Sequence, residues 1–243
     1  MRRKGVDAII HSFLGKAIAR FNLIEDGDRL LVCVSGGFDS MVLLYLLYTR
    51  LKFVPVTYTL RVLHIDLGFP DGESGALEKY VQSLEIPFTR VKTDIGPLAH
   101  SEANRENPCF LCSRMRRKFI FQNAEALGYN KIVMGHNRDD VLETFFLNMA
   151  FSGEMSTMVP KQPFFGGQFL IIRPFYLVDE DVIRRFARRH GIPAFADGCP
   201  TGGNSKRALI RDWLESLYPH NRRIKGTLFH ALSNVRTDYL PKL

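Results

Sequence analysis

Hydrophobic positions along this chain follow two spacings in turn. Apolar side chains recur at helical intervals over residues 6–21, whereas residues 30–34 form a continuous apolar run of strand length. The same alternation predicts further strands near 57–66, 88–91, 131–134 and 169–172, and helices near 39–51, 72–84, 114–127, 139–151, 179–190, 206–217 and 224–235. Strands that alternate with helices predict an α/β fold with a doubly wound, mostly parallel sheet, whose ligands bind at the carboxyl ends of the strands.

Two long connections interrupt this rhythm. Residues 93–112 form a polar stretch that ends in a cysteine pair, and residues 152–168 form an excursion containing Gly, Pro and Phe. Loops longer than about 12–15 residues are uncommon and often functional. The pattern predicts a helical N-terminal extension over 1–28, a catalytic domain over 29–200 and a helical C-terminal segment over 201–243.

The composition is typical of a globular protein that needs no disulfides. The chain has 243 residues, of which 46% are hydrophobic and 24% charged, so it can bury a core without disulfides. No apolar run approaches the roughly 20 residues that cross a bilayer, and no signal-peptide core is present. We therefore expect a soluble, cytoplasmic protein without a membrane partner. The net charge of +8 is compatible with a polyanionic partner but also with many enzymes.

A glycine turn joins the first strand to the helix that follows it. Ser35, Gly36 and Gly37 end the strand, and Asp39 and Ser40 open the helix. Such a turn, together with the N–H groups of the helix start, can surround a phosphate, although a plain turn with a capped helix is the alternative. The string Ser-Gly-Gly-x-Asp-Ser lacks the Gly-Lys-Ser/Thr ending of the kinase and GTPase loop. It resembles the PP-loop of the N-type ATP pyrophosphatases, which implies an adenine nucleotide alpha hydrolase-like fold.

This resemblance extends to the ends of two other predicted strands, and it implies cleavage of ATP between its α and β phosphates. The ATP-binding residues that it implies are Ser35, Gly36, Gly37, Asp39, Ser40, His64, Asp66, Gly135 and His136. Asp39, Asp139 and Asp140 are candidates to hold Mg²⁺, which prefers hard oxygen ligands. Helix capping is the alternative role for Asp139 and Asp140.

The four cysteines fall into two groups. Cys33 lies inside the first predicted strand and is expected in the core. Cys109 and Cys112 follow the long polar loop, and Cys199 lies far downstream in a flexible turn. Three thiolates could ligate an iron–sulfur cluster on three corners and leave one iron open. By spacing alone, zinc binding, a redox pair and free thiols stay open as alternatives.

Several motifs in a fixed order resemble those of the TtcA family of tRNA 2-thiocytidine synthetases, from about residue 15 to the end of the chain. They are the segments 35–40, 109–117, 135–140, 146–149 and 172–174, followed by Cys199. The resemblance implies a 4Fe-4S cluster on Cys109, Cys112 and Cys199. It also implies ATP and Mg²⁺ as cofactors and a cysteine desulfurase as the source of persulfide. The substrate that it implies is a tRNA, thiolated at C2 of the cytidine at position 32 of the anticodon loop. A homodimer is compatible with this resemblance.

This chain departs from the family at two places. The segment of the third cysteine has one Cys where many members have Cys-x-x-Cys, and His136-Asn137 stands where two histidines are common. A tRNA 2-thiouridine synthetase and a lysidine synthetase are therefore the enzymatic alternatives. A nucleotide-gated RNA-binding protein without turnover is the alternative from another class.

Basic side chains gather beside the proposed ligands. One group follows the cysteine pair and the other follows Cys199. Because phosphate contacts supply most of the affinity for nucleic acid, we expect these groups to bind tRNA, with solvated helix faces as the alternative. The residues are Arg114, Arg116, Arg117, Lys118, Lys206, Arg207 and Arg211.

Overall fold

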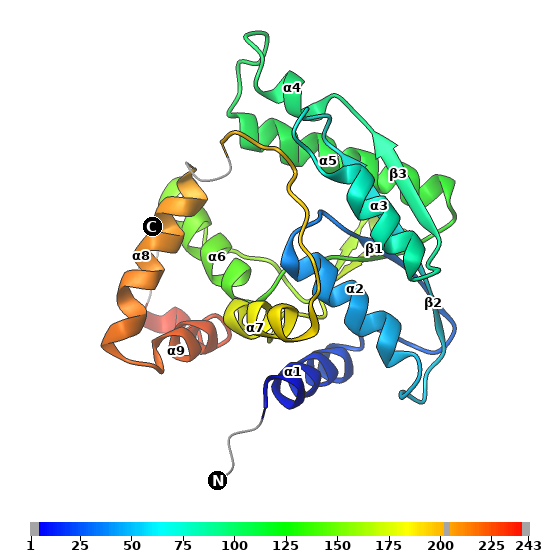
Figure 1. Ribbon diagram of the computed structural model, residues 1–243. Helices are drawn as coiled ribbons and strands as arrows, with labels where there is room; N and C mark the ends of the chain where they lie inside the picture. The colour runs from blue at the N-terminus through cyan, green and yellow to red at the C-terminus, as the bar shows by residue number, and fades with distance from the viewer. Residues whose placement is uncertain (1–4, 202–204, 240–243) are drawn as a thin grey trace. The chain divides into compact units, whose positions relative to one another are not determined.

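The computed structural model describes residues 5–201 and 205–239 (Figure 1). Residues 1–4, 202–204 and 240–243, which belong to the two predicted terminal segments, lie outside the described part. In chain order the elements are α1 (Val6–Phe21), β1 (Asp28–Cys33), α2 (Phe38–Arg50), β2 (Tyr58–Asp66), α3 (Ser74–Ser83), β3 (Phe88–Lys92), α4 (Ile95–Ala99), α5 (Pro108–Ala126), β4 (Lys131–Val133), α6 (Arg138–Ser152), β5 (Lys161–Phe164), β6 (Phe169–Ile172), α7 (Glu180–His190), α8 (Lys206–Leu217) and α9 (Ile224–Ala231).

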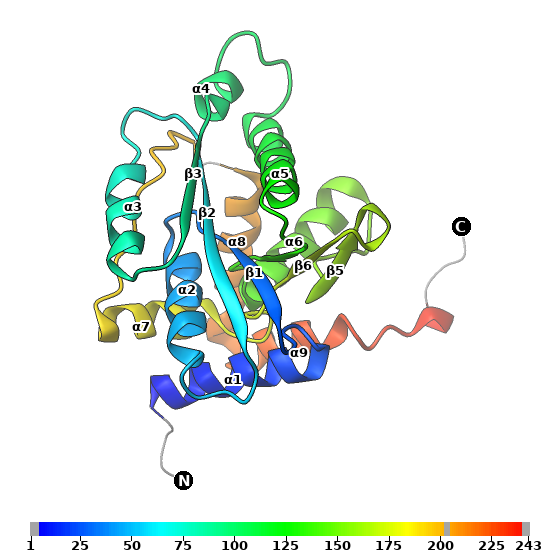
Figure 2. The same cartoon turned by 90° about the vertical axis from the view of Figure 1, so that its right-hand side faces the viewer.

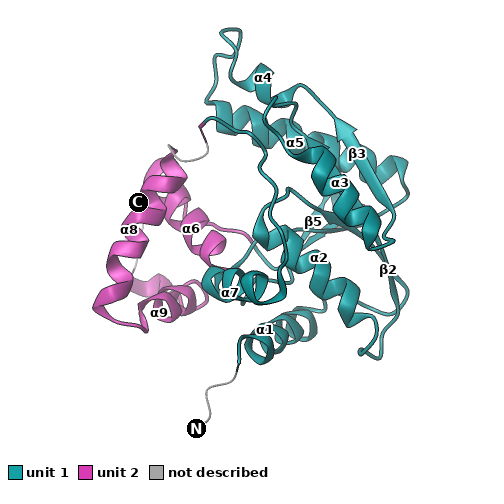
Figure 3. Cartoon of the chain, in the orientation of Figure 1, with its two compact units in different colours: residues 1–137, 159–200 teal, residues 138–158, 201–243 magenta. Residues whose placement is uncertain are grey.

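The chain divides into two compact units (Figure 3). Unit 1 comprises Met1–Asn137 and Val159–Pro200, and unit 2 comprises Arg138–Met158 and Thr201–Leu243. The sequence pattern assigned α6 to the catalytic domain, whereas the units group it with α8 and α9. The reason is its apolar face, because Leu142 of α6 shares a buried cluster with Ile210 and Leu214 of α8.

A six-stranded sheet forms the centre of unit 1. Its order is β3-β2-β1-β4-β6-β5, and all neighbours are parallel except β5, which runs antiparallel to β6. Helices α2 and α3 cover one face and α5 covers the other, as Figure 2 shows. The predicted doubly wound α/β fold is thereby confirmed. The strand order reverses between β1 and β4, which is where such sheets bind ligands.

Two stretches that the pattern predicted as loops contain regular structure. Helix α5 begins at Pro108 and not near residue 114, because the Asn107 side chain accepts hydrogen bonds from the N–H groups of Cys109 and Phe110. Asn followed by Pro is a strong signal for a helix start. Residues 161–164 form edge strand β5, which contains Pro163. A proline within a strand is tolerated at a sheet edge, and this hid β5 from the pattern.

None of the helices in the described part of the chain is long and apolar enough to span a bilayer.

A buried carboxylate connects two helices of unit 2. The Glu143 side chain is 3% exposed, with Arg211 Nε 2.7 Å from Oε1 and Arg207 Nη1 3.0 Å from Oε2. Asp140, one turn earlier on α6, also lies 3.6 Å from Arg207. Buried charges are tolerated when they are paired, so the two arginines allow Glu143 to pack between α6 and α8.

Replacing Glu143 with glutamine keeps the volume of the side chain but removes its charge. We expect Glu143→Gln to lower the free energy of unfolding by about 1–3 kcal/mol, because the bonds to two guanidinium groups lose their ionic character. Urea denaturation measures the change. Glu215→Gln, at an exposed glutamate of α8, is the matched control and should change stability by less than about 0.5 kcal/mol. Equal losses for the two variants would contradict the role of Glu143.

Candidate functional site

The turn between β1 and α2 presents main-chain donors to a ligand. Gly36 has a φ of +98°, a conformation that glycine adopts without strain. Ser40 closes the turn, since its Oγ donates to the Gly37 carbonyl at 2.9 Å and accepts from the Ser35 N–H at 3.2 Å. Gly37 occupies the N-cap position of α2, and no described side chain caps the helix there. The first-turn N–H groups and the helix dipole can therefore stabilise an anion such as phosphate.

Gly135 forms a second wall of this site. It follows β4, and a Cβ atom at this position would lie 3.0 Å from the Ser40 nitrogen and 3.1 Å from the Asp39 carbonyl carbon. A side chain would thus displace the main chain of the glycine turn. The structure brings the predicted residues after β1 and after β4 together at the switch point of the sheet. His136, the next residue, is half-buried.

The end of β2 supports the turn from a third side. Buried His64 has its Nδ1 2.8 Å from the Val34 carbonyl and its Nε2 2.9 Å from Ser74 Oγ. Since a carbonyl can only accept, Nδ1 carries the proton and Nε2 accepts from the serine. Burial lowers the pKa of His64, so the ring is neutral. Both ring nitrogens are engaged, so the His64 side chain joins the end of β1 to the start of α3.

Asp66, the last residue of β2, forms an ion pair with Arg90 of β3. The closest contact joins Oδ2 to Nη2 at 2.6 Å. Burial opposes ionisation of this carboxyl, but the hydrogen bonds from Arg90 and from the Gly68 N–H outweigh burial and lower its pKa. Arg90 was not among the predicted site residues. The parallel register, which pairs His64 with Arg90, is a property of the sheet that the sequence pattern does not contain.

The segment after α7 runs past the start of α2 (Figure 1). The Phe195 N–H donates to the Gly36 carbonyl at 2.9 Å. The Glu73 N–H donates to the Ala196 carbonyl at 2.9 Å, and the Ala196 N–H donates to the Glu73 carboxylate at 2.7 Å. The first contact fixes the 195–199 segment to the glycine turn, and the other two fix it to the start of α3. Sequence reasoning missed Glu73 and Phe195 because these contacts join segments that are distant along the chain.

Three of the four thiols share one electrostatic neighbourhood. Cys109 is exposed, and Cys112 and Cys199 are half-buried. Burial raises the pKa of Cys112, the Arg116 guanidinium opposes this rise, and the thiols of Cys199 and Cys109 add to it. The thiols of Cys109 and Cys199 therefore both act on the Cys112 thiol, and all three belong to unit 1.

Cys33 differs from these three. Burial raises its pKa to about 12, so the thiol stays protonated at neutral pH. It packs against the apolar cluster between the sheet and α5. The prediction that Cys33 is a core residue is confirmed.

The metal-binding predictions have unequal support. In the described ranges, no group of three or more His, Cys, Asp and Glu side chains could hold a single metal ion. A cubane cluster binds each thiolate at a different iron, so its ligands lie farther apart than those of one ion, and the donor chemistry of the three thiols fits it. Asp39 belongs to unit 1, whereas Asp139 and Asp140 belong to unit 2. There Lys225 pairs with Asp139, and Arg207 pairs with Asp140.

The predicted tRNA-binding cations also differ in their surroundings. On α8, Arg207 and Arg211 pair with buried Glu143, and Lys206 lies 4.8 Å from the ring centre of Phe151. Their charges therefore contribute to the packing of unit 2. On α5, Arg114 pairs with exposed Glu106 at 3.2 Å. Arg116 is half-buried near the thiols, and Arg117 and Lys118 are exposed.

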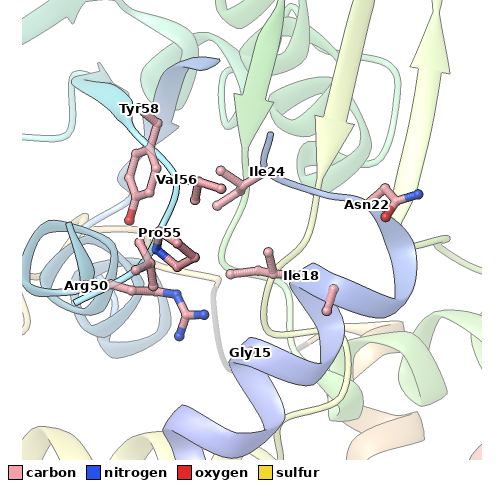
Figure 4. A pocket seen from close by; sticks show the side chains of 10 residues that line it. Gly15, Ile18, Asn22, Ile24, Arg50, Pro55, Val56 and Tyr58 are labelled. Carbon is pink, nitrogen blue, oxygen red and sulfur yellow. The ribbon is translucent and has the colours of Figure 1, made fainter. Parts of the chain in front are cut away.

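A pocket of about 240 Å³ lies between α1 and the connection from α2 to β2 (Figure 4). Ile18, Ile24 and Val56 give it apolar walls, and Arg50 reaches its edge. Tyr58 starts β2, so the pocket is at the amino ends of the strands. None of the predicted site residues lines it, and it is separate from the glycine turn.

Comparison with known proteins relates this geometry to a family. The PP-loop domain family matches residues 9–218. A protein of Cupriavidus metallidurans named tRNA-cytidine(32) 2-sulfurtransferase is 36% identical over 233 residues, which cover 95% of this chain and 74% of that protein. A protein of the same name from Vibrio cholerae is 35% identical over 231 residues, covering 93% and 74%.

Solved structures share the fold. The U34-tRNA thiolase NcsA from Methanococcus maripaludis, solved with its 4Fe-4S cluster, has a TM-score of 0.75 and 20% identity, covering 97% of this chain and 81% of that chain. The NH3-dependent NAD synthetase from Campylobacter jejuni has a TM-score of 0.52 and 13% identity, covering 99% of each chain. The matched profile and the sequence identity show that this chain belongs to the PP-loop family and, within it, to the family of tRNA-cytidine(32) 2-sulfurtransferases.

Proposed function

We propose that this protein uses ATP to replace the C2 oxygen of a tRNA cytidine, at position 32 of the anticodon loop, with sulfur. The observation that carries the proposal is the hydrogen bond from the Phe195 N–H to the Gly36 carbonyl, which connects the 195–199 segment, and Cys199 within it, to the glycine turn. The thiols of Cys109 and Cys199 both act on the Cys112 thiol, which supports a shared role for the three.

The chemistry explains why ATP is needed. The C2 carbonyl of cytosine is flanked by nitrogens and is a poor electrophile, so its oxygen must first become a leaving group. The C2 oxygen attacks the α phosphorus, an O–P bond forms, and pyrophosphate leaves with the electrons of the broken P–O bond. A sulfur nucleophile then attacks C2, and AMP departs with the former C2 oxygen.

The residues of the turn position and stabilise the phosphates in this proposal. The N–H groups around Gly36 and Gly37 and the first turn of α2 offset the negative charge that develops on pyrophosphate. Gly135 keeps the opposite wall free of side chains, so the nucleotide can approach main-chain donors. Positioning of the two substrates supplies the remainder of the catalysis, and no residue is assigned as a general acid or base.

Cys109, Cys112 and Cys199 would hold a 4Fe-4S cluster. With three protein ligands, the cluster would supply one open iron at which the sulfur to be transferred can bind. We further propose a cysteine desulfurase as the source of persulfide, a homodimer as the assembly, and Mg²⁺ on the phosphates with Asp39 as a ligand.

Nucleoside analysis tests the reaction itself. We expect anaerobically purified protein, supplied with ATP, sulfide and unmodified tRNA, to form 2-thiocytidine and release pyrophosphate in equal amounts, measured by mass spectrometry and a pyrophosphate assay. Formation of 2-thiouridine instead would show that the protein modifies uridine and would contradict cytidine as the substrate. Pyrophosphate release without any thionucleoside would contradict sulfur transfer, and no pyrophosphate release would indicate an RNA-binding protein without turnover.

Substitution of single cysteines distinguishes the proposed cluster ligands from the cysteine that packs in the core. We expect Cys109→Ser, Cys112→Ser and Cys199→Ser each to abolish 2-thiocytidine formation and to lower the iron content after reconstitution. Cys33→Ala is the matched control and should keep both, because its thiol packs against apolar side chains. Full iron content in all three serine variants would contradict the proposed ligand set.

Alanine variants of two glycines test whether the glycine turn binds ATP or whether any strained glycine would have the same effect. Gly36 and Gly27 both have positive φ values, of +98° and +79°, but a Cβ on Gly36 would lie 2.7 Å from the Phe195 carbonyl oxygen, whereas a Cβ on Gly27 meets nothing within 4 Å. Gly27→Ala should lose roughly 1 kcal/mol of stability because of its positive φ. Gly36→Ala should lose more, because its Cβ would also displace the Phe195 carbonyl. We expect only Gly36→Ala to weaken ATP binding, by about 10-fold or more, in isothermal titration calorimetry. An equal loss of ATP affinity in Gly27→Ala would contradict this assignment.

A further inference from the structure

The outer face of α5 carries alternating aromatic and basic side chains. Phe110, Arg114, Arg117 and Phe121 follow one another at spacings of three or four residues, which places them on one side of the helix. Phe110 is 54% exposed, and the Arg114 guanidinium lies 5.6 Å from the centre of its ring. Lys118 lies beside Arg117, and both are exposed. This stripe starts at the cysteine pair and runs along the helix.

The turn between β5 and β6 faces the later part of this stripe. Together they enclose a groove of about 460 Å³, lined by Arg114, Arg117 and Lys118 on one side and by phenylalanines on the other. The Phe121 ring contacts those of Phe164 and Phe165, with centroid distances of 5.2 and 5.0 Å. The whole groove belongs to unit 1.

Phe165 has an unusual backbone conformation. Its φ is +50°, which bulky residues adopt rarely, and its side chain is 65% exposed. Gly166 and Gly167, which follow, also have positive φ values and adopt them without strain. Glycine in place of Phe165 would therefore suit the turn better. Strained residues cluster at functional sites, and here the strain presents an aromatic ring to the groove.

The charges around the groove favour an anion. Arg114, Arg117 and Lys118 line it, against one carboxylate, that of Glu125, which accepts from Gln168 Nε2 at 3.5 Å. Arg114 shares its charge with Glu106. Neither Arg117 nor Lys118 has an ion-pair partner among the residues that the structure describes. The groove thus combines basic side chains for a phosphate with exposed rings for a planar, stacking group.

We propose that this groove binds an unstacked nucleotide of the tRNA that lies a few positions from the target base in the anticodon loop. The proposal rests on the proposed function and adds a second binding site to it. Single-stranded RNA loops are recognised by bases that stack on aromatic side chains, with basic side chains on the backbone. Phe165 and Phe121 supply the stacking surface, and Arg117 and Lys118 bind the flanking phosphates.

The position of the groove agrees with this occupant. Phe121 follows Cys112 by nine residues on the same helix, which corresponds to about 13.5 Å along the axis. A nucleotide a few positions along an unstacked RNA strand can therefore reach the groove while the target base lies at the thiols. A second copy of this chain suits the groove less well, because each copy carries a net charge of +8.

Variants of Phe165 test the stacking. We expect Phe165→Ala to raise the Kd for a fluorescently labelled, unmodified tRNA by roughly 5- to 100-fold at fixed salt, whereas Phe165→Tyr should bind like the wild type. The melting temperature of Phe165→Ala should fall by only a few degrees, because alanine keeps the positive-φ conformation and the substitution removes the contacts of a ring that is 65% exposed. Phe53→Ala is the matched control, since Phe53 is 83% exposed elsewhere on unit 1, and it should not change the Kd.

Variants of the basic side chains test the phosphate contacts. The double variant Arg117→Ala with Lys118→Ala should reduce the slope of log K against log salt concentration by about 1–2. Lys52→Ala, at an exposed lysine next to Phe53, should leave the slope unchanged.

Two comparisons separate failure of this inference from failure of the proposed function. If the wild type binds and thiolates tRNA but Phe165→Ala and the double variant bind tRNA equally well, the groove proposal is overturned while the function stands. If the wild type neither binds nor thiolates tRNA, the proposed function fails. A change of oligomeric mass in Phe165→Ala at unchanged tRNA affinity, measured by light scattering, would assign the groove to a second copy of the chain and overturn the proposal.

Discussion

Close approach of main-chain segments at glycines is the constraint on which the site depends. A Cβ atom would lie 2.7 Å from the Phe195 carbonyl oxygen at Gly36, and 3.0 Å from a backbone nitrogen at both Gly135 and Gly198. Side chains at these positions would separate the segments. Because the segments touch, the N–H groups of the proposed phosphate site are held by main chain on several sides, as preorganised stabilisation of an anion requires.

The same contacts bring two kinds of chemistry onto one unit. The 195–199 segment pairs with the glycine turn through Phe195, and it carries Cys199 toward the thiols at the start of α5. A nucleotide held by the turn and a sulfur held by the thiols would therefore approach one substrate base from one scaffold. Positioning reactants in this way can supply a large part of the lowering of a reaction barrier.

Basic side chains that look alike in the sequence have different physical roles. Arg207 and Arg211 neutralise buried Glu143, so they belong to the packing of unit 2. Arg117 and Lys118 remain exposed beside aromatic rings. A count of charges cannot separate these roles, since the difference depends on whether a carboxylate from another helix is buried nearby. The net charge of +8 is thus only partly available to a polyanion.

The fold class and the glycine turn could be predicted from short stretches of sequence. The spacing of hydrophobic residues, a pair of glycines and the succession of strand and helix are each visible within a few residues. Local signals also contained the start of α5, in Asn107 followed by Pro108, although the apolar pattern alone missed it. Tertiary structure decided what depends on contacts between distant segments. These are the pairing of β5 at the sheet edge, the grouping of α6 with the C-terminal helices and the approach of Cys199 to Cys112. Each results from burial or hydrogen bonding across the fold, and no spacing along the chain encodes it.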